Sequence, residues 1–368
     1  MHMKTLSSIP FRKAALMLIL LCTVHQAKSQ IEDFNFFDGG IEDGIALFVP
    51  YITPWVNAFG TDLNGGWYNT AKPHKFGGFD ITLTASTTFV PDKDLSFDLS
   101  DLGFTNLEVV GTQTITPTVA GENENGPDLE YVVQNALDPG QEVTVASFPS
   151  PPGSGINFLP APMIQAGVGL PYGTEIIGRF MPKLKIPSTD VKIGLWGIGL
   201  KHSIAQHIKP LKAAPIDISL FGGYTRLNSS VGFFYEPFSY DNLVDYGPED
   251  FQDQAVDIET SGFNISLVAS TTFPIINVYG SLGYSKSSTD VKILGNIPIP
   301  SYDPAIDAFN PVITDQDIAT IPDISIKNIS GLRTTIGARL KLAVVTIHVD
   351  YTYAKYSVVT GGIGFSFR

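Results

Sequence analysis

His348 and Asp350 are the two side chains whose types and spacing come nearest to catalytic chemistry in this sequence. They stand two positions apart in the alternating stretch 345–355, so an extended strand would place both on one face. A histidine oriented by a carboxylate can activate a serine nucleophile, as happens in some barrel lipases. The sequence places no serine to complete such a set. We therefore expect no enzyme activity, and we interpret His348 and Asp350 as a hydrogen-bonded pair.

Three cations occupy the corresponding face of the preceding stretch, residues 328–342. Arg333, Arg339 and Lys341 alternate there with apolar side chains. This pattern predicts strands with one apolar and one polar face. In a membrane barrel the apolar set faces lipid and the polar set faces the lumen. The candidates for the lining of a lumen are therefore Arg333, Arg339, Lys341, His348 and Asp350.

The rest of the composition excludes several kinds of site. Cys22 is the one cysteine, and it lies in the N-terminal stretch 1–29, so the remainder offers no disulfide or thiolate metal site. We find no phosphate-binding loop, zinc spacing or nucleotide fingerprint, and the acids of 241–259 match no calcium loop. We therefore expect no metal and no cofactor. A net charge of −13 argues against nucleic-acid binding, which needs a basic surface.

Residues 1–29 have the organisation of a secretory signal peptide. Basic residues precede an apolar core at 14–24, and Ala27-Lys28-Ser29 supplies small residues for cleavage. The core is too short for a membrane-spanning helix. Removal of residues 1–29 takes away four bases and no acids, which leaves 19 bases against 36 acids and a net charge of −17. We therefore expect secretion through the inner membrane.

The stretch FDITLTASTTF at 79–89 alternates strictly, and FNISLVASTTF at 263–273 repeats it closely. A strand that crosses a bilayer needs roughly nine to eleven residues, and these stretches have that length. The chain is 43% hydrophobic and only 16% charged, yet after residue 30 it has no uncharged apolar run of helix-spanning length. Only helices and closed barrels cross a bilayer with every backbone group satisfied. The sequence therefore predicts a transmembrane antiparallel β-barrel.

The spacing of the connections supports this prediction. Alternation marks twelve candidate strands between residues 64 and 368, and a further hairpin would make fourteen. The three long connections, 101–160, 230–256 and 293–327, then fall at one end of the barrel, as outer loops do in bacterial barrels. The expected strands are 64–72, 76–90, 93–100, 161–170, 174–186, 190–203, 214–229, 257–273, 275–292, 328–342, 345–355 and 357–368.

Residues 30–63 do not alternate, and we interpret them as a plug-like segment. The stretch 41–60 is apolar and contains two prolines, which predicts a short broken helix. Such a segment would be sheltered inside the lumen, with Phe48, Tyr51 and Trp55 as the plug candidates. The alternative is an amphipathic segment against the periplasmic rim of the barrel. The domain organisation is therefore signal peptide 1–29, plug-like segment 30–63 and barrel 64–368.

Two stretches carry a resemblance to a known family. ALFVPYITPWVNAFG followed by LNGGWYNTAKPHKFGGFDITLTAS, and GIGLKHSIAQHIKPLKAAPIDISLFGGY at 197–224, resemble an uncharacterised branch of the long-chain fatty-acid transporter group. The resemblance implies an outer-membrane barrel with a lumen plug that passes or binds a small hydrophobic molecule. It assigns no ligand residue.

The functional expectations follow from the barrel and from the resemblance together. The first is an outer-membrane barrel of a Gram-negative bacterium that contacts outer-membrane lipid and passes a hydrophobic molecule. The alternative is a non-transporting barrel that acts as a scaffold or docking partner for secretion or surface proteins, with the protein partner at the outer loops.

Overall fold

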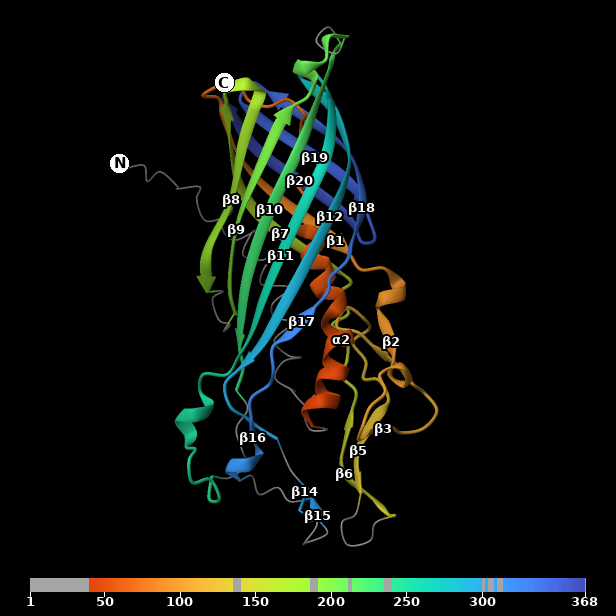
Figure 1. The fold of residues 1–368 in the computed structure, drawn as a ribbon. Coiled ribbons are helices and arrows are strands. Elements are labelled where there is room, and N and C mark those ends of the chain that lie inside the picture. The colour runs from red at the N-terminus through yellow and green to blue at the C-terminus, as the bar shows by residue number, and fades with distance from the viewer. Residues whose placement is uncertain are drawn as a thin grey trace, which may run out of the picture.

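The computed structural model describes residues 40–367, apart from 135–139, 186–190, 211–213, 235–239, 300–301, 304–307 and 310–313. The expected signal peptide, 1–29, and the first part of the plug-like segment lie outside the described residues. The fold is a closed antiparallel barrel of ten strands with one helix near its N-terminus (Figure 1).

The barrel strands follow one another around the ring in chain order, and two pairings decide its closure. The first strand pairs with the last over its whole length, from Phe79 opposite Phe367 to Phe89 opposite Ser357, and β11 pairs with β12. The strands are β1 (Phe79–Phe89), β7 (Phe158–Leu170), β8 (Thr174–Lys185), β9 (Val191–Ser203), β10 (Ile216–Gly232), β11 (Ala255–Thr271), β12 (Ile276–Leu294), β18 (Ser330–Leu342), β19 (Val345–Tyr353) and β20 (Ser357–Phe367).

The two faces of the wall have different chemistry. Large apolar side chains point outward and stay exposed, among them Ile81, Ile198, Leu267, Leu282 and Phe365. Threonines, serines and arginines point inward and are buried. This is the side-chain arrangement of a barrel that faces hydrocarbon. Within the part of the chain that the structure describes, no helix is both long enough and apolar enough to span a bilayer.

The barrel has ten strands, so the expected number of twelve to fourteen is corrected. Residues 64–72 form turns and bends inside the barrel, because two glycines precede adjacent aromatic residues there and no alternation is kept. Residues 93–100 form a 3₁₀ turn and the short strand β2 (Ser96–Asp98), which pairs with β4 (Ile115–Pro117) outside the ring. Asp98 ends that strand because its carboxylate accepts a hydrogen bond from the Ser100 N–H at 3.0 Å.

All three long connections lie at the same end of the barrel, which we call the long-connection end. They span 90–157, 233–254 and 295–329, whereas turns such as Pro171–Gly173 lie at the opposite, short-turn end (Figure 1). Because 64–72 is not a strand, β1 runs toward the long-connection end and β11 runs away from it. The two similar stretches are therefore antiparallel wall strands, and only the second is followed by a short turn.

Residues 90–134 and 140–157 form a small cap beyond the long-connection end, around the helix α2 (Ile41–Asp62). Its larger sheet joins β3 (Leu107–Val109), β5 (Asp128–Gln134) and β6 (Glu142–Pro149). Asp43, in the first turn of α2, accepts backbone hydrogen bonds from Thr105, Asn106 and Leu107 at 2.7–3.0 Å. The helix therefore ties the cap to the barrel.

In the described parts of the other two long connections, the elements are all short. The strand β17 (Ile324–Ile326) pairs with the end of β12, and β13 (Ile297–Pro298) pairs with β16 (Ile318–Ala319). A further pair joins β14 (Tyr302–Asp303) to β15 (Ala308–Phe309). The 3₁₀ turns are η2 (Asp92–Asp94), η3 (Leu99–Asp101), η4 (Pro171–Gly173), η5 (Ala205–His207), η7 (Pro248–Phe251) and η8 (Asp315–Asp317).

Candidate functional site

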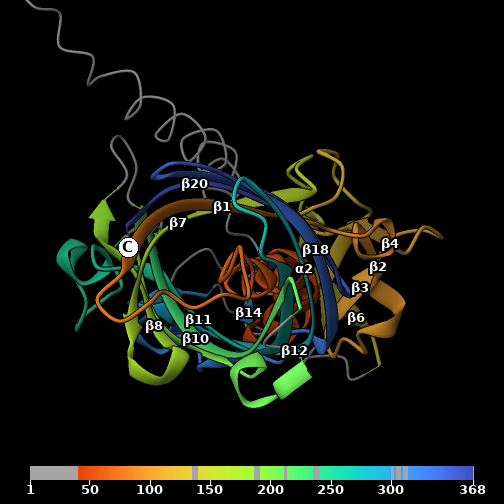
Figure 2. The same ribbon diagram turned by 90° about the horizontal axis from the view of Figure 1, so that it is seen from above.

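The interior of the barrel is occupied by residues 63–78, which we call the lumen segment. This segment leaves α2 near the long-connection end and reaches β1 at the short-turn end. Seen from above, it runs inside the ring (Figure 2). It touches inward-facing side chains of strands all around the wall, from Ser86 on β1 to Thr225 on β10 and Arg333 on β18. The chain therefore fills its own lumen.

Two buried arginines hold the start of the lumen segment through its backbone. Arg179 on β8 is 2% exposed, and it donates to the carbonyls of Leu63 at 3.1 Å and Gly65 at 2.6 Å. Its Nε donates to the Gln165 side chain, and its guanidinium lies 3.6 Å from the centre of the Trp67 ring. Arg333 donates to the carbonyl between them, that of Asn64, at 2.7 Å. These contacts replace the water that exposed carbonyls would otherwise need.

Glycines make room for the lumen segment on both sides of the contact. Gly66 has φ +62°, a left-handed conformation that favours glycine. On the wall, Gly199 and Gly223 lie opposite one another on β9 and β10 and leave a recess for Trp67. A Cβ on Gly223 would lie 2.9 Å from the Trp67 ring and 2.6 Å from that of Phe221. The recess at Gly199 and Gly223 therefore fixes where Trp67, and with it the lumen segment, sits along the barrel axis.

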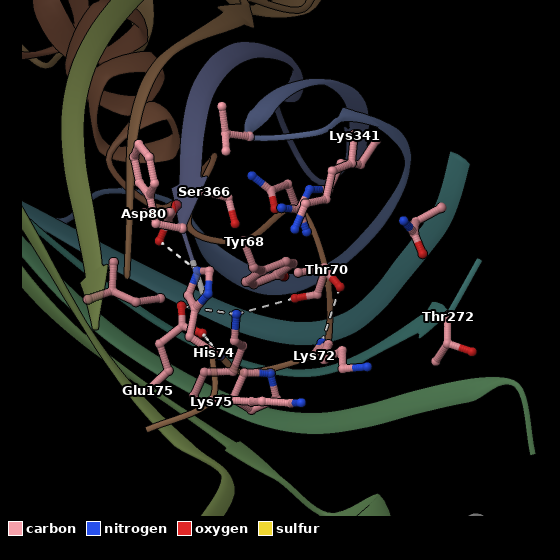
Figure 3. A pocket seen from close by; sticks show the side chains of 18 of the residues that line it. Tyr68, Thr70, Lys72, His74, Lys75, Asp80, Glu175, Thr272, Lys341 and Ser366 are labelled. Atoms are coloured by element: carbon pink, nitrogen blue, oxygen red, sulfur yellow. Dashed lines mark hydrogen bonds and ion pairs between the residues drawn. The ribbon is translucent and has the colours of Figure 1, made fainter. Parts of the chain in front are cut away.

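Between this packed region and the short-turn end, the lumen opens into a cavity of about 500 Å³. Its walls come from the end of the lumen segment and from β1, β8, β9, β12 and β18. Figure 3 shows His74, Asp80 and Glu175 gathered on one side of the cavity, with Lys341 on the other. We call this cavity the mouth cavity. Within the described residues, it is our candidate for a functional site.

One side of the mouth cavity is a network of paired charges. His74 Nε2 lies 3.1 Å from Asp80 Oδ1, and the His74 N–H donates to Glu175 at 2.8 Å. Lys201 Nζ lies 3.2 Å from the other oxygen of Glu175. One ligand atom from each of His74, Asp80 and Glu175 lies within 4.8 Å of the others, so these three could approach a metal ion. The lysine on Glu175 opposes a cation there, because it already neutralises that carboxylate.

The structure places the five lumen candidates on the inner face, but not as one site. Arg333 holds the lumen segment, whereas Arg339 and Lys341 line the mouth cavity. Asp350 accepts a hydrogen bond from the Tyr279 hydroxyl at 2.7 Å, and His348 Nδ1 lies 3.5 Å from the Asn69 amide. The expected hydrogen bond between His348 and Asp350 is therefore replaced by two separate contacts, because each side chain meets a polar group from another part of the chain.

The plug candidates of α2 lie in a different place from the one expected. The Tyr51 hydroxyl donates to the Pro152 carbonyl at 2.9 Å, and the Trp55 indole donates to the Ile156 carbonyl at 3.3 Å. Phe48 is buried in the same apolar cluster, which joins cap residues such as Leu129 to wall residues such as Val291 on β12. These side chains therefore pack where the cap meets the long-connection end of the barrel. The helix is also continuous from Ile41 to Asp62 despite Pro50 and Pro54, so it is not broken.

Several residues that fill the lumen or line its mouth were not among the candidates from the sequence. Trp67 and Tyr68 belong to the stretch 64–72 that was expected to be the first strand, and His74 follows it, whereas Glu175 and Arg179 both lie on β8. One signal was available for the first group. The pair Gly65-Gly66 followed by adjacent aromatic residues breaks the alternation of a membrane strand. No local pattern marks the second group, because its partners come from distant parts of the chain.

Comparison with solved structures finds bacterial outer-membrane proteins at low similarity. The attachment invasion locus protein Ail of Yersinia pestis has 8% sequence identity and a TM-score of 0.24, covering 79% of this chain and 98% of that one. Neisserial surface protein A has 9% identity and a TM-score of 0.24, covering 78% and 97%. The toluene transporter TbuX of Ralstonia pickettii has 9% identity and a TM-score of 0.23, covering 79% and 90%. The description of the barrel rests on its own strand pairing.

Comparison with curated proteins gives no match. A family model, by contrast, matches almost the whole sequence, from residue 3 to residue 367. The chain therefore belongs to the family described as "Family of unknown function (DUF6588)".

Proposed function

We propose that this protein is an outer-membrane barrel that acts as an anchor and docking partner at the membrane surface, with its lumen closed by its own chain. The observation that carries the proposal is the fixation of the lumen segment by Arg179 and Arg333. Because buried guanidinium groups bind three consecutive backbone carbonyls of the segment, we infer that it is a fixed part of the barrel and keeps the lumen closed.

The size of the barrel supports the same conclusion. A barrel of about eight strands has an interior that side chains fill, and open aqueous channels occur at about sixteen strands. Ten strands that also enclose a polypeptide segment leave little room for a passing molecule. The inner wall is also lined by polar groups such as Thr82, Ser86 and Asn264, which do not suit a hydrophobic solute.

The long-connection end supports the docking part of the proposal. The cap shares one apolar core with α2, in which Leu107, Leu129 and Phe148 are buried, so the cap is packed against the helix. It also exposes apolar side chains, Val110 and Ile115. We infer that this end faces the outside, because long connections do so in bacterial barrels. A packed cap at the outer end of a closed barrel offers a surface to which a protein partner can bind.

Conductance of the purified protein in a planar bilayer tests the closed lumen. Gly65→Cys with Ser86→Cys would lock the lumen segment to β1, because the two Cβ atoms would lie 3.3 Å apart, near the usual spacing in a disulfide. We expect no steady channels, whether the disulfide is oxidised or reduced. The Gly65→Cys single variant is the control for the substitution itself. Channels that open on reduction would overturn the proposal.

A photoreactive residue in place of Val110 tests the docking role in intact cells. We expect one reproducible crosslinked protein from this cap position. The same residue in place of Ile198, on the outward face of β9, should give only lipid adducts. Equal patterns from both positions would contradict a partner at the cap.

Passage of a small molecule is the second candidate, and the mouth cavity favours it. Passage would require the lumen segment to leave the wall, so the locked variant would lose uptake that the reduced variant keeps. A lipid-like molecule that copurifies with the protein would support the hydrophobic solute implied by the resemblance to fatty-acid transporters.

A further inference from the structure

The charges of the mouth cavity differ from those of the whole chain. Five bases line it against two acids, although the sequence carries a net charge of −13. The bases are Lys72, Lys75, Lys201, Arg339 and Lys341, and the acids are Asp80 and Glu175. A concave site with an excess of one charge attracts the opposite charge and focuses it there.

Both acids of the cavity are already engaged by neighbours. Asp80 contacts His74 at 3.1 Å and accepts a hydrogen bond from Thr82 at 2.9 Å. Glu175 is bound by Lys201 and by the His74 N–H. These carboxylates therefore have their own partners, and neither forms an ion pair with Arg339 or Lys341 among the described residues.

Arg339 is the strongest evidence for a missing partner. Arg339 is only 8% exposed, and its buried Nε has no hydrogen-bond partner among the described residues. It lines the mouth cavity beside Lys341, two residues along the inner face of β18. A buried cation that forms no hydrogen bond or ion pair is costly, and a second cation beside it increases that cost. An anion in the cavity would remove both penalties.

The geometry also indicates the chemistry of that anion. The guanidinium of an arginine presents a planar fork of N–H groups that matches a phosphate or a carboxylate, and a lysine adds a point charge. Asn277, which faces Arg339 across the β12–β18 pairing, and Ser366 add neutral polar groups to the same wall. A volume of about 500 Å³ falls in the range of small-molecule sites.

We propose that the mouth cavity binds a phosphate-bearing anion, with Arg339 and Lys341 as its principal contacts. The phosphate comes either from a soluble molecule or from the headgroup of a membrane lipid at the short-turn end. This site does not depend on the anchor role, because the fixed part of the lumen segment separates the mouth cavity from the cap. A barrel without channel activity and a conducting barrel could both contain the site.

Calorimetry on the purified full-length protein in neutral detergent tests the site with two probes. Inorganic phosphate represents the soluble source, and a short-chain phosphatidylglycerol represents the lipid source, with the zwitterionic phosphatidylcholine of equal chain length as its reference. We expect saturable binding of at least one probe. Arg339→Gln should weaken it about tenfold or more, because a charge-assisted fork is lost. Lys341→Gln should weaken it less.

Arg226→Gln is the matched control, since Arg226 points away from the lumen on β10 and pairs with Glu259. It removes the same charge and should leave the binding unchanged. Binding of phosphate identifies the soluble source, and binding of phosphatidylglycerol alone identifies the lipid source. Binding of neither probe, or equal weakening by Arg226→Gln and Arg339→Gln, overturns the proposal. Thermal unfolding of each variant without ligand separates lost binding from lost folding.

Discussion

The middle of the lumen and its short-turn mouth both contain a buried arginine, yet the two side chains have opposite surroundings. Arg179 donates to Gln165 and to two carbonyls of the lumen segment, and it lies on the Trp67 ring. Arg339 faces a cavity, and its Nε has no hydrogen-bond partner. Burial alone therefore does not reveal the role of a charge. The number of its partners distinguishes a structural cation from one that is available to a ligand.

The substitution Arg179→Met should give the largest change. It leaves the carbonyl of Gly65 buried without the donor that Arg179 supplies, and the carbonyl of Leu63 with only the Thr225 hydroxyl, so we expect a loss of about 3 kcal/mol or more in the free energy of unfolding. Denaturant-induced unfolding in detergent measures it. We also expect the lumen segment to become accessible to protease. A variant as stable as the wild type would show that the segment is not held by this arginine.

A smaller loss is expected from Gly223→Ala, in the recess for Trp67. The new Cβ would lie 2.6 Å from the Phe221 ring and 2.9 Å from that of Trp67, so overpacking should cost about 1–3 kcal/mol. Gly222→Ala on the same strand is the control, because its Cβ meets nothing within 4 Å and points outward. Equal melting temperatures for the two variants would contradict the close packing of the lumen segment.

The barrel walls were largely predictable, because a membrane wall repeats one simple rule along every strand. The outward apolar residues of β18 and β19, such as Leu332 and Ile347, and the inward cations follow from alternation alone. The side on which the long connections lie also follows from their lengths. These features depend on local sequence, so local sequence reveals them.

The contents of the barrel were not predictable in the same way. Trp67 and Tyr68 looked like part of a strand, and their true position depends on a recess made by Gly199 and Gly223, more than 130 residues away in sequence. Tyr51 and Trp55 looked like a plug, but their donors reach carbonyls of the cap about 100 residues later, at Pro152 and Ile156. Such contacts are set by tertiary packing, which no local pattern encodes.

Removal of the mouth arginine should change stability in the opposite direction from removal of Arg179. Without ligand, Arg339→Met takes away a buried charge that lacks a full set of partners, so we expect a gain of up to about 1 kcal/mol. Thermal unfolding in phosphate-free buffer measures it. A loss as large as that of Arg179→Met would mean that Arg339 is a structural cation, and the contrast between the two regions would fail.

The smallest change should follow Arg226→Met, which gives the baseline for both lumen arginines. Arg226 lies on the outward face of β10 and forms an exposed ion pair with Glu259 across to β11. Exposed pairs contribute little, because water and salt screen them and two long side chains must be ordered. The melting temperature should therefore stay within error of the wild type, at low and at high salt. A clear loss at low salt would show that any arginine on this wall matters, and the effects in the lumen could then no longer be assigned to burial and partner number.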